Sequence, residues 1–185
     1  MSVEMKKCKN RESWLKNRTK YLGGSDAACI LGLNPYKSNL DLYREKIGLV
    51  APPDLSGNEA VAYGTKAEEY IRALFRLDHP EYSVVYVENN SWHNSKYPFA
   101  AASLDGWLVE YGSERKGIWE CKTAIISNKA HAELWNNRIP DNYYCQLLHY
   151  FMVTEFDFAI LRARLRYEYP GNKFITERDY YIERS

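Results

Sequence analysis

The stretch from Ser103 to Ala124 constrains the fold of this chain more than any other part of its sequence. It is typical of two β-strands joined by a tight polar turn, with Asp105 on the first strand and Glu120-Cys-Lys122 on the second. Because strand side chains alternate between faces, Glu120 and Lys122 share one face, and Asp105 can lie beside Glu120 on the neighbouring strand. Two carboxylates and an ammonium group suit a hard divalent cation and a water molecule better than they suit an apolar core.

The pattern Glu-x-Lys occurs three times, and its surroundings separate the three copies. Glu4-Met-Lys6 lies in a polar leader, and Glu114-Arg-Lys116 lies in the turn. Only Glu120-Cys-Lys122 follows apolar β-forming residues, Ile118 and Trp119, which would bury one face of the strand. A surface ladder of salt bridges explains this copy as well as a metal site does, so the rest of the chain must decide between them.

Length and composition indicate one compact domain over residues 1–185 with a flexible leader at 1–12. No apolar run approaches the roughly 20 residues of a transmembrane helix, and the start lacks the apolar core of a signal peptide, so we expect a cytoplasmic protein without membrane contact. The net charge of +1 predicts no general attraction to nucleic acid. DNA binding would therefore depend on a local basic surface.

The four cysteines are scattered and do not form a C-x-x-C pair. Cys8, Cys29, Cys121 and Cys145 also have no histidine nearby at ligand spacing. This spacing argues against a structural zinc or iron–sulfur site and favours reduced, buried thiols.

Periodicity and turn residues predict a mixed sheet with helices packed on it, an α/β or α+β layered domain. In addition to the central strand pair, we expect helices over 11–18, 27–31, 39–47, 58–77, 128–136 and 143–153, strands over 82–88, 99–103, 156–165 and 174–182, and a turn at 89–94.

Several polar residues in these elements admit two interpretations. Ser25 or Asp26 can cap a helix, or the Gly-Gly-Ser turn can bind a phosphate. The adjacent glutamates 68 and 69 are typical of a solvated helix face, although either could serve a site. Gln146 is a polar residue in an otherwise apolar helix, and His149, one turn later, is more typical of a packing residue than of a metal ligand.

Six segments, in order along the chain, match one known pattern. They are Arg18-(x)6-Ser25, Gly64-Thr-Lys-Ala-Glu68, Ser103-Leu-Asp105-Gly106, Gly117-Ile-Trp-Glu120-Cys-Lys122, Gln146 within Tyr-Cys-Gln-Leu-Leu-His-Tyr, and Tyr181-Ile-Glu-Arg. From about Trp14 onward the chain closely resembles the phage lambda exonuclease / YqaJ viral recombinase family of the PD-(D/E)xK nuclease superfamily. This resemblance implies a restriction-endonuclease-like mixed β-sheet core flanked by helices.

The resemblance also implies a role for each matched residue. Asp105 and Glu120 would ligate Mg²⁺ or Mn²⁺ together with the backbone carbonyl of Cys121, and Glu68 would complete the site. Lys122 would orient or activate the attacking water, and its three carboxylate neighbours favour the orienting role. A pocket for a 5′-terminal phosphate would consist of Arg18, Ser25, Ser103 and Gln146.

The implied function is an Mg²⁺-dependent exonuclease that degrades linear duplex DNA, 5′→3′, in phage or prophage recombination in a bacterial host. Implied partners are double-stranded DNA ends, a single-strand annealing recombinase, and further copies of the chain in a trimer. The chain departs from the family by stopping at Ser185, where relatives usually continue. Alternatives are an endonuclease or a nuclease of other polarity on the same fold, a non-catalytic DNA-binding partner in recombination, and a salt-bridged domain without a role on DNA.

Overall fold

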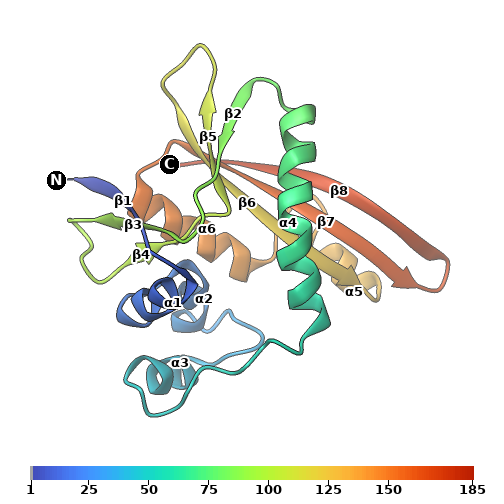
Figure 1. Ribbon diagram of the computed structural model, residues 1–185. Helices are drawn as coiled ribbons and strands as arrows, with labels where there is room; N and C mark the ends of the chain where they lie inside the picture. Colours follow the sequence, from blue (N-terminus) through green and yellow to red (C-terminus); the bar gives the residue numbers. More distant parts are fainter. Residues whose placement is uncertain (1) are drawn as a thin grey trace. The chain divides into compact units, whose positions relative to one another are not determined.

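The computed structural model describes residues 2–185, and the contacts within it divide the chain into two compact units (Figure 1). The helical unit contains the chain up to Pro53 together with Val87–Leu104 and Asp141–Glu155. The sheet unit contains Asp54–Tyr86, Asp105–Pro140 and Phe156–Ser185. The sequence predicts a single domain over residues 1–185, and this stays a prediction. Because the two units alternate along the chain, no single change in composition marks a boundary between them.

The helical unit combines four helices with a small antiparallel sheet in the order β1-β3-β4. Its elements are β1 (Val3–Lys7), α1 (Arg11–Lys20), α2 (Gly24–Ile30), α3 (Asn39–Lys46), β3 (Asn90–Asn94), β4 (Ala101–Ala102) and α6 (Asp141–Thr154). The last helix packs against α2, β3 and β4. Its buried side chains, among them Leu147 and Val153, form the core of this unit.

Two predictions for this unit are wrong. Residues 3–7 of the expected flexible leader form β1, which pairs with β3, and most of the expected turn at 89–94 is β3 itself. Polar residues such as Asn are poor strand formers, but tertiary contacts override that preference here. The buried Asn90 amide donates to the backbone oxygens of Val87 and Leu104 at 2.9 and 2.8 Å and accepts from the Leu104 N–H at 2.9 Å.

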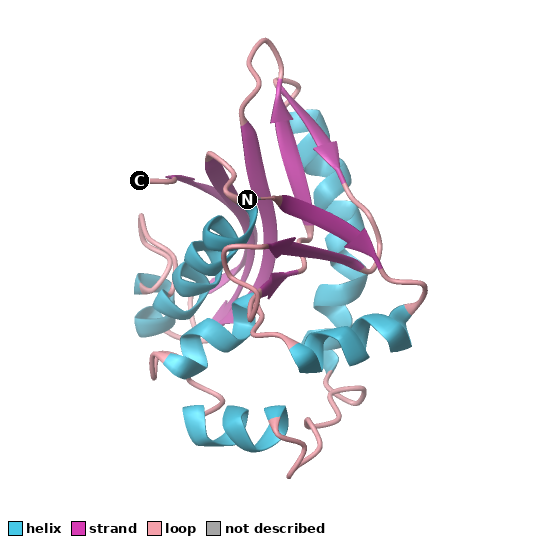
Figure 2. Ribbon diagram, turned by 90° about the vertical axis from the view of Figure 1, so that its left-hand side faces the viewer, coloured by secondary structure: helices cyan, strands magenta, loops and turns pink. Residues whose placement is uncertain are grey.

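The sheet unit is a five-stranded mixed sheet in the order β2-β5-β6-β7-β8. Its elements are α4 (Glu59–Asp78), β2 (Tyr82–Val85), β5 (Gly106–Glu110), β6 (Lys116–Ile126), α5 (Lys129–Glu133), β7 (Phe158–Tyr169) and β8 (Asn172–Glu183). Only β6 and β7 run parallel; the other neighbours are antiparallel. Figures 1 and 2 show α4 running along one face of this sheet.

The core of the sheet unit lies between α4 and the strands. Ile71 and Phe75 of α4 pack onto Trp119 of β6, together with Leu108 and Phe158 from the neighbouring strands. These five side chains are at most 2% exposed. Burying a large apolar side chain contributes about 1.5–3 kcal/mol, so this cluster fixes the position of α4 on the sheet.

β5 and β6 separate at the point where the predicted site begins. Their last paired residues are Gly106 and Trp119, whereas β6 continues to Ile126 alongside β7. Within the described residues, no strand pairs with β6 on the β5 side beyond Trp119. This leaves a strand edge to which side chains and ligands can bind through backbone groups.

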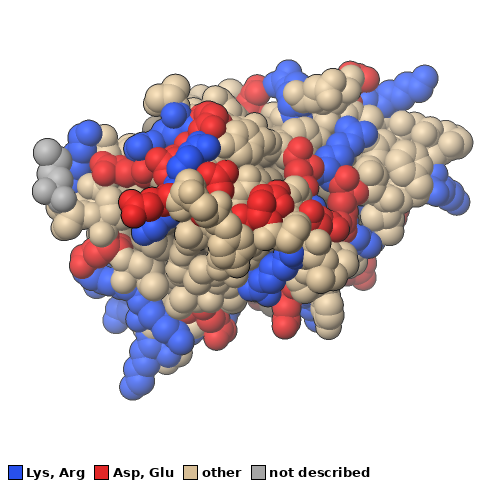
Figure 3. Space-filling model, turned by 90° about the horizontal axis from the view of Figure 1, so that it is seen from above, with Lys and Arg blue, Asp and Glu red and all other residues tan. Residues whose placement is uncertain are grey.

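The mixed sheet with flanking helices confirms the predicted α+β class. Over residues 2–185, the structure contains no helix with the length and apolar character required to cross a bilayer. Lys and Arg side chains are interspersed with Asp and Glu side chains over the face seen in Figure 3, as the net charge of +1 would suggest.

Candidate active site

Glu120 and Lys122 lie on the β6 edge where β5 has separated. Glu120 is 1% exposed, and its Oε1 accepts from Lys122 Nζ at 2.6 Å. Trp119 and Cys121 point to the opposite face and pack in the core beneath α4. Side-chain alternation along β6 therefore puts Glu120 and Lys122 on one face and Trp119 and Cys121 on the other, although the four residues are consecutive in the sequence.

Asp105 binds to the edge of β6 that β5 leaves unpaired. Its Oδ2 accepts from the backbone N–H of Cys121 at 3.0 Å. Because the N–H and C=O of one strand residue point to the same side, the Cys121 carbonyl is directed toward the edge that Asp105 occupies. The structure thus brings together Asp105, Glu120, Lys122 and the Cys121 backbone, and it does so within the sheet unit alone.

Glu68 reaches this region from α4 and is held by Arg72. The Arg72 Nη1 donates to Glu68 Oε1 at 2.9 Å and to the backbone oxygen of Asp105 at 2.8 Å. The guanidinium of Arg72 is buried and lies 3.8 Å from the centre of the Tyr86 ring. One arginine therefore links the helix that carries Glu68 to the start of the strand that follows Asp105.

Burial, and then the charge of Asp105, raises the pKa of both Glu120 and Glu68. Burial is the main cause for Glu120, whose pKa rises to about 8; the charge of Asp105 adds to the rise, and Lys122 opposes it. Burial and then Asp105 raise the pKa of Glu68 to about 7, against the opposing effect of Arg72. The same surroundings raise the pKa of the Cys121 thiol, chiefly by burial. The site therefore concentrates more negative charge than its two internal cations neutralise.

The donor set fits a hard divalent cation by its chemistry. Carboxylate and backbone oxygens are the ligands that Mg²⁺ prefers, and a cation would relieve the repulsion that raises the carboxyl pKa values. Over residues 2–185, no group of three His, Cys, Asp or Glu side chains has the arrangement of a complete metal site. Glu120 is turned toward Lys122 and Glu68 toward Arg72.

A second cluster lies in the helical unit and contains the four residues of the predicted phosphate pocket. Trp14 Nε1 donates to Ser103 Oγ at 3.1 Å. The guanidinium of Arg18 lies 4.7 Å from the centre of the Trp14 ring and donates through Nη2 to Ser25 Oγ at 3.4 Å. Trp14 therefore connects Ser103 with the exposed pair formed by Arg18 and Ser25.

Gln146 joins this cluster through the close packing of α2 against α6. An added Cβ at Gly24 would lie 2.9 Å from Gln146 Cγ and 2.4 Å from Tyr150 Cε1, so only glycine allows this approach. The buried Gln146 amide donates through Nε2 to Tyr150 Oη at 2.7 Å. Ser25, which follows Gly24 directly, is thereby held next to α6.

The expected helix cap is wrong in its details. α2 begins at Gly24, earlier than predicted, and its N-cap is Gly23. Asp26 Oδ2 accepts from the Gly23 N–H at 2.9 Å and pairs with Lys46 Nζ at 2.7 Å, so it stabilises the turn. The Ser25 hydroxyl is not the capping group and faces Arg18 instead.

Comparison with known proteins places the chain in a family. Residues 13–157 match the family described as the YqaJ-like viral recombinase domain. The chain belongs to that family. The protein named YqaJ of Bacillus subtilis (strain 168), itself uncharacterized, is 32% identical over 173 residues, which is 92% of this chain and 51% of that protein. This YqaJ-family chain thus spans about half the length of that relative, and the resemblance found in the sequence is confirmed.

Solved structures show the fold of the YqaJ-family chain. The alkaline exonuclease LHK-Exo from Laribacter hongkongensis matches with a TM-score of 0.65 at 18% identity, covering 94% of this chain and 82% of that one. The same protein in complex with dAMP matches with a TM-score of 0.59 at 18% identity, over 91% and 82% of the two chains. The restriction-endonuclease-like fold predicted from the sequence is confirmed.

Sequence reasoning missed three residues that organise these clusters in the YqaJ-family chain. Arg72 follows Glu68 by one helical turn, a spacing that favours an ion pair and could have drawn attention to it. Trp14 likewise precedes Arg18 by one helical turn, but its partner Ser103 and the partners of Gly24 are distant in sequence. His149, by contrast, has the packing role expected of it: its Nε2 lies 3.0 Å from the Ala101 oxygen, and burial lowers its pKa.

Proposed function

We propose that this chain is a metal-dependent nuclease that hydrolyses phosphodiester bonds of linear duplex DNA from 5′ ends. The observation that carries the proposal is the buried Glu120–Lys122 pair beside Asp105, on strands that separate at that point. A salt bridge on a protein surface would not need a 1% exposed carboxylate whose pKa is raised by burial and by a neighbouring carboxylate. Such perturbation is typical of functional sites.

Asp105, Glu120, Glu68 and the Cys121 carbonyl would hold Mg²⁺ or Mn²⁺. When bound, such an ion supplies a nucleophilic water at neutral pH and neutralises charge on the phosphate. Lys122 lies beside Glu120 as an ammonium group. A cation so placed orients the attacking water and the phosphate oxygen by hydrogen bonding, and we assign it that role in preference to proton abstraction.

The cluster in the helical unit would bind the 5′-terminal phosphate. A guanidinium and two hydroxyls offer the donors that a phosphate dianion accepts, and Arg18, Ser25 and Ser103 already contact one another directly or through Trp14. Gln146 would hold the start of α2, at Gly24 and Ser25, in place beside α6. Recognition of a 5′-phosphate would give the reaction its 5′→3′ direction, because the strand could then enter from one end only.

The biological setting in our proposal is phage or prophage recombination. The single-stranded DNA that the reaction leaves would pass to a single-strand annealing recombinase, and a trimeric assembly of the chain would encircle the DNA. The membership in a viral recombinase domain family supports this setting.

Digestion of a linear duplex with Mg²⁺ tests the proposal. We expect ordered loss of the 5′-phosphorylated strand, sparing of closed circular DNA, and slower digestion of a duplex with 5′-hydroxyl ends. Lys122→Ala should abolish the activity, whereas Lys116→Ala, an exposed member of a second Glu-x-Lys pattern on the same strand, should not.

Each alternative has its own outcome in this experiment. Equal activity of wild type and Lys122→Ala would remove the Glu120–Lys122 pair from the active site. Cleavage of closed circles would favour an endonuclease. DNA binding without cleavage in wild type would favour a non-catalytic recombination partner.

A further inference from the structure

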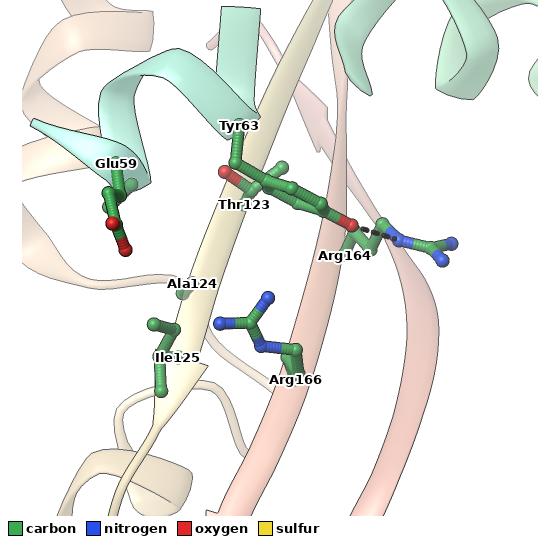
Figure 4. Close-up of a pocket in the computed structure, with 8 residues that line it drawn as sticks. Glu59, Tyr63, Thr123, Ala124, Ile125, Arg164 and Arg166 are labelled. Atoms are coloured by element: carbon green, nitrogen blue, oxygen red, sulfur yellow. Dashed lines mark hydrogen bonds between the residues drawn. The ribbon is translucent and has the colours of Figure 1, made fainter. Parts of the chain in front are cut away.

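The sheet unit contains a pocket of about 270 Å³ between the start of α4 and the ends of β6 and β7 (Figure 4). We call it the arginine pocket and define it by six of its lining residues: Tyr63, Thr123, Ala124, Ile125, Arg164 and Arg166. None of these residues belongs to either cluster described above. The size suits one nucleotide-sized group, being just below the usual range for sites that bind drug-sized ligands.

The strand register brings the two arginines to one face. β6 and β7 are parallel, with Thr123 opposite Arg164 and Ile125 opposite Arg166. Laterally paired residues share a face of the sheet, and alternation puts Arg164 and Arg166 on the same side. Tyr63 of α4 lies over this face, as Figure 4 shows.

The Arg166 guanidinium lies over one face of the Tyr63 ring, and the ring remains partly exposed to a planar ligand. The Tyr63 side chain is 39% exposed, and the Arg166 guanidinium carbon lies 5.5 Å from its ring centre. The Tyr63 hydroxyl accepts from Arg164 Nε at 3.1 Å, which fixes the ring orientation. Ala124 and Ile125 add apolar surface beside the ring.

Glutamates hold both arginines in place and set the charge of the pocket. Arg164 Nη1 donates to Glu177 of β8, and Arg166 Nε pairs with Glu168. A guanidinium has five N–H donors, so one carboxylate does not exhaust either side chain. Glu59 also lines the pocket. With three glutamates near two arginines, the pocket is unsuited to a free phosphate ion; it suits a ligand that adds a stacking surface to a phosphate.

The arginine pocket lies further along β6 than the candidate active site and on the face that α4 covers, whereas the Glu120 and Lys122 side chains lie on the other face. Thr123 directly follows Lys122 on β6, and an added Cβ at Gly64 of α4 would lie 3.1 Å from Thr123 Oγ1. At about 3.3 Å per strand residue, Ile125 lies only about 10 Å along β6 from Lys122. The β6 edge that β5 leaves uncovered spans both positions.

We infer that the arginine pocket binds one nucleotide of single-stranded DNA further along the β6 edge from the cleavage site, with its base stacked on Tyr63 and its phosphate on Arg164 and Arg166. This inference rests on the proposed nuclease function for its substrate, but it concerns binding alone. Base–aromatic stacking combined with arginine contacts to the backbone is the usual way in which proteins bind single strands without sequence preference.

Binding of a fluorescent 12-nucleotide oligo-dT in EDTA tests the inference without any cleavage. Tyr63→Leu should weaken binding about tenfold through the lost stacking surface. Arg166→Gln should lower the slope of log K against log salt by about 0.7, the value for one phosphate contact on a single strand. Arg115→Gln, which removes another ion-paired arginine of the sheet unit, should change neither quantity.

A cross-linking experiment on the wild-type protein tests the inference without relying on variants that could misfold. An oligonucleotide with 5-iodo-deoxyuridine should cross-link to Tyr63 on irradiation, as mass spectrometry of the peptides would show. Excess dAMP should compete for the cross-link more strongly than inorganic phosphate at equal ionic strength.

Three outcomes would overturn the inference. They are the absence of single-strand binding by wild type, unchanged binding by both folded pocket variants, and cross-links that omit Tyr63. The proposed nuclease function fails on a different observation, namely intact duplex after digestion with Mg²⁺. Tight single-strand binding that depends on Tyr63 would support nucleotide binding in the arginine pocket even if the duplex stayed intact.

Discussion

The buried carboxyl of Glu120 should make the metal-free protein less stable as the pH rises. Its pKa is about 8 in the folded protein, compared with 4.5 for an ordinary glutamate. Between these values the folded protein binds one proton more than the unfolded chain, so the free energy of unfolding falls with pH. The contribution is fully present below pH 4.5 and is lost as the pH rises through about 8.

The size of the effect follows from the two pKa values. Each pH unit between them costs about 1.4 kcal/mol, so the whole interval corresponds to about 5 kcal/mol. With a urea m-value of about 2–3 kcal/mol/M for a chain of this size, the unfolding midpoint should fall by about 2 M. Mg²⁺ should reverse the decline at pH 8, because a bound cation favours the ionised carboxylate.

Urea unfolding in EDTA at pH 5, 6, 7 and 8 measures the effect, with Glu120→Gln as the test variant. Glu68, whose pKa is about 7, and His79, His93 and His149 also have shifted pKa values near this range, so the readout is the difference between the two proteins at each pH. Glu120→Gln should reduce the decline to the part that Glu68 and the histidines cause, and the exposed-site control Glu69→Gln should retain it in full. A wild-type midpoint that rises from pH 5 to 8 relative to Glu120→Gln would refute the reasoning.

Three further changes test the contacts around the two clusters. Gly24→Ala should destabilise the protein by about 1–3 kcal/mol, since its Cβ would lie 2.4 Å from Tyr150 Cε1; Gly57→Ala, with nothing within 4 Å, should change the urea midpoint little. Arg72→Lys should weaken Mg²⁺ binding, measured by calorimetry, by about tenfold because one ammonium cannot replace the stacked guanidinium. Trp14→Phe should reduce the preference for 5′-phosphorylated over 5′-hydroxyl duplex in a binding assay by about fivefold, a loss of about 1 kcal/mol.

The elements that local patterns specify were predictable from the sequence. The hairpin around Asp105 and Glu120 combines alternating polarity with a polar turn, and α4 has apolar residues at helical spacing. β1 and β3 were not predictable, because they form through pairing between residues about 90 positions apart. Asn90 shows why: its side chain replaces backbone partners that no local rule can identify.

The same difference between local patterns and long-range contacts applies to the residues of the candidate sites. Glu120 and Lys122 could be found because strand alternation puts them on one face, whereas Asp105 lies just before β5 and meets β6 through the Cys121 N–H. Arg72 and Trp14 were visible only in part, because the one-turn spacings Glu68–Arg72 and Trp14–Arg18 are local but the contacts with Asp105 and Ser103 form only in the tertiary structure. Residues that form a motif are therefore visible in the sequence, whereas the residues that position them become visible in the fold.

The two internal cations explain how so acidic a site can fold before any metal binds. A buried carboxylate without a partner costs several kcal/mol, and a paired one much less. Lys122 lies on Glu120, while Arg72 lies on Glu68 and on the backbone of Asp105. Arg72 is also bonded to the backbone oxygen of Asp105, and Lys122 lies on the same strand as Glu120, so both cations can remain nearby when a carboxylate turns toward a divalent ion. The arrangement that stabilises the metal-free fold thus also leaves Lys122 beside the water and phosphate that it would orient.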